Sequence, residues 1–147
     1  HEAEIGIALW FHDAIYEGRS HDNELKSADW ASAELLLAGC SEDRARRVHA
    51  LVMATRHNAM PVTRDAKILV DVDLSILGAS TERFDEYETQ VRAEYAWVPD
   101  DVYRSKRAGI LQAFLDRESI YNTSCFRAHC EERARVNLGR SICHLAI

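Results

Sequence analysis

The chain has 147 residues, enough for one domain with a substantial core, and its formal net charge at pH 7 is −6. Hydrophobic residues make up 47% of it and charged residues 29%, a balance that excludes long disorder. The negative charge offers no general attraction to nucleic-acid backbones or anionic membranes, and no apolar run is long enough to span a bilayer. We therefore expect a cytoplasmic protein with no membrane contact and no evident nucleic-acid surface.

Glycine and proline are scarce, with 6 and 2 residues, which favours long helices over tight turns. No repeat or linker interrupts the chain, so we predict a single domain over 1–147. Its fold class is all-α, an irregular bundle of seven helices. The expected helices cover about 2–16, 23–38, 42–57, 64–77, 81–96, 99–115 and 123–140.

The first expected helix, 2–16, is apolar on most sides and should be central and buried. It nevertheless contains His12 and Asp13, which are costly to bury without a partner or a metal ion. Consecutive residues on a helix point about 100° apart, so both side chains can reach one ion only near a helix end or bend. The alternative is a hydrogen-bonded core histidine beside an unrelated aspartate.

Capping residues mark the next helices. Asp22 or Ser20 can cap the helix at 23–38, and Gly39 can end it. Ser41 is a suitable N-cap for the third helix. In that helix His49 lies in the middle and His57 in the last turn, where the helix dipole would favour an ordinary cationic side chain.

The segment 64–77 contains a second acidic pair in an apolar run, Asp71 and Asp73. Residues 68–74 also fit a strand, but Gly78 as a terminal residue and the lack of a strand partner favour a helix. On a helix the two carboxylates diverge by about 200°, so only one can join His12 and Asp13. We choose Asp73. Asp71 could then support a metal ligand or cap the helix, but we expect it to face solvent.

We assign no catalytic or metal-binding role to the cysteines or the tryptophans. The cysteines show no zinc-site spacing, and Cys125 and Cys130 fall on different faces of one helix, so we expect reduced, partly buried thiols. The tryptophans are Trp10, Trp30 and Trp97, and we expect them to be partly buried in the core. Exposed tryptophans would instead suggest an interaction or assembly domain, including a homo-oligomer.

Several motifs, in order along nearly the whole chain, resemble the metal-dependent phosphohydrolases of the HD superfamily. This resemblance implies an HD-like helical fold. It also implies a divalent ion, with His12 and Asp13 as the paired ligands and Asp73 as the last ligand. The motifs occupy 8–16, 22–28, 54–57, 69–78, 92–99 and 134–138.

The superfamily pattern also has a histidine on a helix well upstream of the pair. Here only His1 precedes it, eleven residues before His12. We therefore expect the missing ligand in an N-terminal helix outside this sequence, unless the ligand and the activity have been lost. By the same resemblance, His57 could extend the site toward substrate or a second metal. Imidazole and carboxylate ligands suit manganese, iron, cobalt, nickel or magnesium equally.

The predicted function is metal-dependent hydrolysis of a small phosphomonoester or phosphodiester, such as a nucleotide, by activated water. Asp13 would take part in catalysis, and Asn23 and Glu24 could orient a ligand or the water. Arg56, with Lys26 and Arg107 as weaker candidates, could offset phosphate charge. The alternative is a degenerate helical module that binds a small molecule or a protein.

Overall fold

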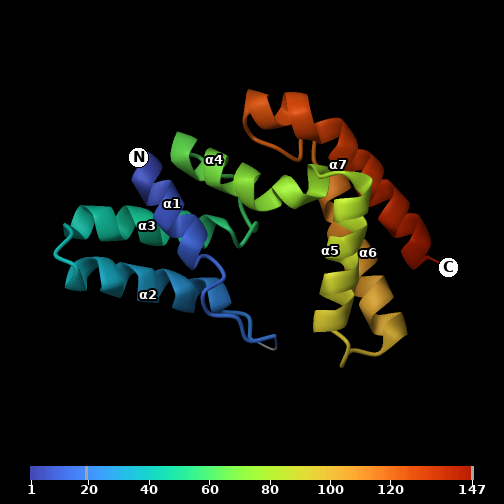
Figure 1. The fold of residues 1–147 in the computed structure, drawn as a ribbon, viewed down its shortest axis with the longest axis horizontal. Helices are drawn as coiled ribbons and strands as arrows, with labels where there is room; N and C mark the ends of the chain where they lie inside the picture. Colours follow the sequence, from blue (N-terminus) through green and yellow to red (C-terminus); the bar gives the residue numbers. More distant parts are fainter. Residues whose placement is uncertain (19, 147) are drawn as a thin grey trace. The chain divides into compact units, whose positions relative to one another are not determined.

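The computed structural model describes residues 1–18 and 20–146, and within these residues every regular element is helical (Figure 1). The all-α prediction is confirmed, and all seven expected helices are present. The elements are α1 (Glu2–Phe11), α2 (Asn23–Leu37), α3 (Glu42–Ala54), α4 (Arg64–Asp73), the 3₁₀ helix η1 (Leu74–Gly78), α5 (Thr81–Glu94), α6 (Asp100–Leu115) and α7 (Ser124–Leu145).

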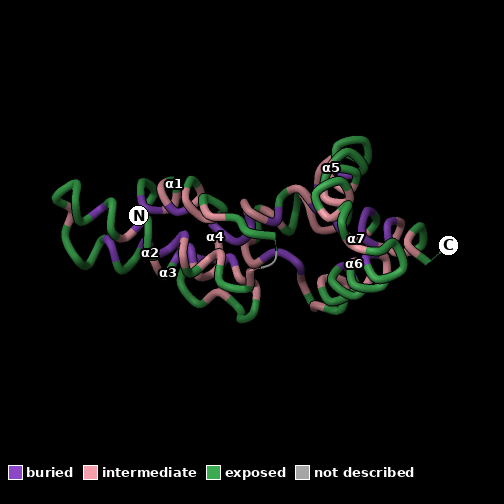
Figure 2. The backbone as a smooth tube through the Cα atoms, turned by 90° about the horizontal axis from the view of Figure 1, so that it is seen from below, coloured by how far each residue is buried: buried purple, intermediate pink, exposed green. Residues whose placement is uncertain are grey.

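The helices form two compact units, His1–Asp73 and Leu74–Ile147. In the first, α1 packs on α2, α3 and α4, and α2 packs on α3. In the second, α7 packs on α6 and η1, and α5 packs on η1. Buried and exposed positions alternate along the helices as amphipathic sequences require (Figure 2). The first core contains Ala8, Ala31, Val48, Val52 and Leu69, and the second contains Leu77, Phe84, Leu111, Tyr121 and Leu138.

Side-chain hydrogen bonds cap the N-termini of three helices. The side chains of Ser41, Ser80 and Thr123 each accept a hydrogen bond from the backbone of the first turn that follows. Asp22 is the N-cap of α2 but makes no such bond. Gly39 follows the C-cap with a φ of 78°, a left-handed conformation that glycine adopts without a Cβ penalty.

Helix α1 is shorter and more exposed than predicted. It ends at Phe11, because the next residue, His12, uses its ring to bond the carbonyl of Leu9 at 2.6 Å. In a continuing helix that carbonyl would accept from the amide of Asp13. Only Glu4 and Ala8 are buried in α1, so the expectation of a buried central helix was wrong.

Glu4 is the buried polar residue that the apolar pattern of α1 concealed. Its side chain is 4% exposed and accepts two hydrogen bonds from the guanidinium of Arg47 on α3, at 2.8 and 2.7 Å. Arg44 lies 3.5 Å away. The hydrogen bond from Arg47 lowers the pKa of Glu4 despite burial, which keeps the carboxylate charged. This pair ties α1 to α3.

The expectation of buried tryptophans was wrong for Trp10, which is 83% exposed. Trp30 and Trp97 are 43% and 55% exposed. Trp30 uses part of its surface in an edge-on contact with Phe11, with ring centroids 5.4 Å apart. The four cysteines are free, as predicted, but Cys125 and Cys143 are exposed rather than partly buried.

In the second unit, α7 and the segment before it bind the backbone of η1. Tyr121 donates its hydroxyl proton to the carbonyl of Leu74 at 3.0 Å, and the side chain of Asn137 donates to the carbonyl of Leu77 at 2.9 Å. Arg133 donates to the carbonyl of Gly78 at 3.0 Å. Carbonyls at the end of the 64–78 helical segment are therefore satisfied by side chains.

Within the part of the chain that the structure describes, no helix combines the length and the apolar character that crossing a bilayer would require.

Candidate functional site

Three helices of the first unit end close together and carry the predicted ligands at these ends. His12 is the C-cap of α1, His57 lies three residues beyond the end of α3, and Asp73 is the last residue of α4. Contacts among the three side chains place these helix ends together. The C-termini of α1 and α3 carry partial negative charge and attract a positive group, whereas α4 continues into η1 after Asp73.

Asp73 lies between the two histidines. One of its oxygens is 3.3 Å from Nε2 of His12, and the other is 2.9 Å from Nε2 of His57. Nε2 of His12 is also 3.2 Å from a carboxylate oxygen of Asp13. The structure therefore joins all four residues predicted as metal ligands in one cluster, His12, Asp13, His57 and Asp73.

Exposure differs sharply within this cluster. The side chains of His12, His57 and Asp73 are 22%, 22% and 19% exposed, whereas that of Asp13 is 73% exposed. The cluster is thus recessed on the side of α3 and α4 and open to solvent at Asp13. A substrate or water would approach from the Asp13 side.

His57 has a backbone conformation that is rare for its residue type. Its φ is 54°, and it lies beyond α3 rather than in the last helical turn as predicted. Left-handed backbone costs a residue with a Cβ about 1–2 kcal/mol, and such residues are often found at functional sites. Here the conformation accompanies the contact between the imidazole and Asp73.

The charges of the cluster reinforce one another. Hydrogen bonds to Asp13 and then to Asp73 raise the pKa of His12 from 6.5 to about 10, although burial opposes them. Burial raises the pKa of Asp73, but hydrogen bonds from His12 and His57 outweigh it and lower the pKa from 3.8 to about 2. At neutral pH the cluster therefore holds a proton on His12 and a charged Asp73.

The other ring nitrogen of His12 determines the orientation of the imidazole. Because the carbonyl of Leu9 can only accept, Nδ1 of His12 is the donor in their 2.6 Å bond. Nε2 is thus the nitrogen that faces the carboxylates, and it would carry the free lone pair in the neutral ring. This backbone bond to Nδ1 is the usual support of a metal-binding histidine.

The donor set fits a divalent cation by its chemistry. Two imidazole nitrogens and two carboxylates are the ligands that manganese, iron, cobalt, nickel or zinc accept. The imidazole nitrogens and carboxylate oxygens of these residues lie 2.9–3.3 Å apart, as hydrogen-bonded or ion-paired groups do. Among the described residues, no group of three or more such side chains already surrounds a common ion position.

Asp71 does not face solvent, and that expectation was wrong. Its exposure is 0%, equal to that of Leu69 on the same helix. The buried face of α4 is wider than the alternation of charged and apolar residues suggested, because α1 and α3 both pack against it. Asp73, rather than Asp71, is the aspartate of α4 that contacts His12.

The predicted orienting residues lie at the start of α2. Asn23 uses its side-chain amide on the backbone of Glu17, and Glu24 faces Arg56, with Oε2 and Nε 3.7 Å apart. Arg56 also donates to the carbonyl of His21 at 3.2 Å. These residues connect the loop after His12 and Asp13 to the end of α3, next to His57.

The remaining cationic candidates differ in position. Lys26 is 3.2 Å from Glu17, in the loop between α1 and α2. Arg107 belongs to the second unit, where it pairs with Glu88. His1 is the N-cap of α1 and His12 its C-cap, so a helix of about 15 Å separates them.

One residue that supports the site was not predicted. Ser27 is fully buried, and its hydroxyl accepts from the amide of Ile15 at 3.0 Å and donates to the carbonyl of Ile15 at 3.4 Å. Ile15 follows Asp13 by two residues. A serine at a buried helical position was the available signal, since a buried hydroxyl requires a partner.

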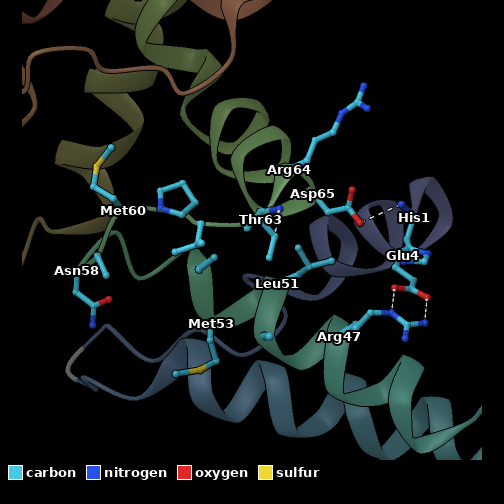
Figure 3. A pocket seen from close by; sticks show the side chains of 16 residues that line it. His1, Glu4, Arg47, Leu51, Met53, Asn58, Met60, Thr63, Arg64 and Asp65 are labelled. Atoms are coloured by element: carbon cyan, nitrogen blue, oxygen red, sulfur yellow. Dashed lines mark hydrogen bonds and ion pairs between the residues drawn. The ribbon is translucent and has the colours of Figure 1, made fainter.

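A separate pocket of about 810 Å³ lies against α1, α3 and the segment between α3 and α4 (Figure 3). The Glu4–Arg47 pair lies on one side, and Met60 and Thr63 line another part. The lining contains none of the four clustered ligand candidates. The largely apolar lining and the His12 cluster are therefore distinct features of the same unit.

Comparisons of the chain with models of protein families, with curated proteins and with solved structures gave no match. The resemblance to the HD superfamily thus depends on the sequence motifs, and the case for a function on the geometry of His12, Asp13, His57 and Asp73.

Proposed function

We propose that this protein is a metal-dependent phosphohydrolase whose cation is held by His12, Asp13, His57 and Asp73. The observation that carries the proposal is that two imidazoles share the carboxylate of Asp73. His12 contacts one of its oxygens and His57 the other, and His12 also contacts Asp13. A bound divalent cation supplies Lewis acidity that activates water and polarises a phosphoryl oxygen.

Charge supports the need for a cation. Two carboxylates and the C-termini of α1 and α3 make the cluster unfavourable for a phosphate alone. A divalent cation would reverse the local charge and allow an anionic substrate to approach the open side at Asp13. Its carboxylate, 73% exposed, is available to hold the proton of an attacking water.

Arg56 is the basic residue of this unit that we assign to the substrate phosphate. Its side chain is 28% exposed, and its Nε lies 3.7 Å from Glu24, a loose ion pair that a competing anion could replace. It precedes His57 directly, so a phosphate could contact both the guanidinium and the cation. Glu24 keeps the guanidinium at the start of α2 in the absence of substrate.

The test combines metal content with phosphoester turnover. The protein is loaded with manganese, iron, cobalt, nickel or magnesium, and the bound metal is measured by elemental analysis. We expect close to one ion per chain in the wild type and a large loss in Asp13→Ala and Asp73→Asn. Asp29→Asn is the matched control, because Asp29 forms a 3.0 Å pair with His49 outside the cluster.

The loaded wild type should then hydrolyse p-nitrophenyl phosphate, bis-p-nitrophenyl phosphate or a nucleotide. Turnover that needs metal and is lost in Asp73→Asn supports the proposal. Stoichiometric metal without turnover of any phosphoester favours the alternative, a helical module that binds a small molecule or protein. No metal in the wild type contradicts the metal centre itself.

A further inference from the structure

The loop that follows His12 and Asp13 is fastened to α2 by two side chains. Asn23 accepts from the amide of Glu17 and donates to its carbonyl, both at 3.1 Å. Ser27 makes the same pair of bonds to the amide and carbonyl of Ile15, at 3.0 and 3.4 Å. Each side chain thus satisfies both backbone groups of one loop residue.

Asn23 and Ser27 are four residues apart on α2. Residues with this spacing rise about 6 Å and share a face of the helix. The two side chains can therefore bind two residues of the same neighbouring loop, Glu17 and Ile15.

We call these four bonds from Asn23 and Ser27 the clamp, and they hold the chain just after Asp13. The turn that contains Asp13 is closed by a bond of 3.0 Å from the amide of Ala14 to the carbonyl of Phe11. On the C-terminal side, Ser27 holds Ile15. Asp13 is exposed and has little packing of its own, so these backbone contacts determine where its carboxylate lies.

We propose that Asn23 and Ser27 are positioning residues that hold the 15–17 loop and thereby keep the Asp13 carboxylate beside Nε2 of His12. The effect on metal affinity rests on the proposed function, whereas the effect on the loop backbone does not. Lys26, 3.2 Å from the Glu17 carboxylate, adds a weaker tie from the same helix. Neither Asn23 nor Ser27 needs to contact the cation or the substrate.

The first readout is amide hydrogen exchange measured by NMR without metal. We expect Ser27→Ala to accelerate exchange at Ile15, and Asn23→Ala to accelerate it at Glu17, each at least about fivefold, because each loses its acceptor. Asn23→Asp keeps an oxygen for the Glu17 amide and should protect it. Ser32→Ala, on the same helix but outside these bonds, should leave both amides unchanged.

The second readout is Mn²⁺ affinity by calorimetry. Ser27→Ala and Asn23→Ala should weaken it about tenfold, as loss of supporting hydrogen bonds does at metal sites. Ser32→Ala should bind as the wild type does. The melting temperature of each variant, measured in parallel, separates local loosening from global unfolding.

The outcomes distinguish the two proposals. Absence of Mn²⁺ binding in the wild type would contradict the metal centre, and the clamp would then be judged by exchange alone. Unchanged exchange at Ile15 and Glu17 would overturn the clamp in either case. Faster exchange combined with wild-type Mn²⁺ affinity would overturn its positioning role.

Discussion

His12 combines three contacts that together define its chemistry. Its Nδ1 donates to Leu9, and its Nε2 faces Asp13 and Asp73. These contacts keep the ring in one orientation and raise its pKa to about 10. A proton and a metal ion therefore compete for the same nitrogen.

This competition predicts proton release on metal binding. At pH 7.5 His12 is protonated in the absence of metal, because its pKa is about 10. Binding of Mn²⁺ should release about one proton, and the apparent affinity should rise roughly tenfold per pH unit below that pKa. Calorimetry in buffers of different ionisation enthalpy measures the release. A binding enthalpy that is the same in all buffers would contradict it.

His57 provides a second prediction. His57→Gly removes the cost of a left-handed backbone at φ 54°, about 1 kcal/mol, and also the bond to Asp73, which is worth about the same. We expect the melting temperature to change by only a few degrees while Mn²⁺ affinity falls at least about tenfold. His57→Ala should lose affinity equally but be the less stable of the two. Equal stability of both variants would show that the backbone is not strained there.

Among the helices, the ends of α1, α3 and α4 bring the candidate ligands together, and two side chains of α2 bind the loop that follows Asp13. A second element-level feature is the close contact of η1 with α7. A Cβ added at Gly78 would lie 2.6 Å from Cβ of Cys130, 2.8 Å from its carbonyl oxygen and 2.9 Å from the hydroxyl oxygen of Tyr121. Glycine is required here for close approach of two backbones.

Gly78→Ala should therefore destabilise the second unit by about 1–3 kcal/mol, measured by chemical denaturation. Cys130→Ala should not rescue it, because the obstructing Cβ and carbonyl remain. Gly109→Ala is the matched control, since a Cβ there would meet no atom within 4 Å. It should be neutral or slightly stabilising. Comparable losses in both glycine variants would contradict the packing argument.

At the scale of the whole molecule, the four candidate ligands all belong to the unit His1–Asp73. The two charged partners His12 and Asp73 couple the stability of this unit to pH. The raised pKa of His12 contributes stability that is complete below about 6.5 and lost as pH rises toward 10. The lowered pKa of Asp73 contributes stability that is complete above 3.8 and lost as pH falls toward 2.

In the absence of metal, the contribution of this cluster to stability should thus be greatest between about pH 4 and 6.5. We expect it to decrease by on the order of 4 kcal/mol between pH 6 and pH 10. Urea denaturation across this range measures the change. Asp73→Asn should flatten both limbs of the profile, and an unaltered profile in that variant would assign the pH dependence to other groups.

Helix number and approximate bounds followed from periodicity and caps, because amphipathic spacing and residues such as Ser41 and Gly39 act locally. The proximity of Asp73 to His12 was expected from ligand chemistry and the motif resemblance, because the angular separation on a helix allows only one of Asp71 and Asp73 to reach the site. Burial was predicted less well. Trp10 is exposed and Asp71 is buried, the opposite of what was expected for each, because burial depends on which neighbouring helix covers each face.

The sequence alone was therefore sufficient for the all-α class, and it named the four side chains that the fold brings into contact. It was not sufficient for the end of α1 at Phe11, the left-handed His57 or the clamp from Asn23 and Ser27. These features arise from contacts between segments distant in the chain or from side chains competing for backbone groups. Only the folded chain brings His57 to Asp73 and Ser27 to Ile15, and those contacts decide how the ligands are oriented.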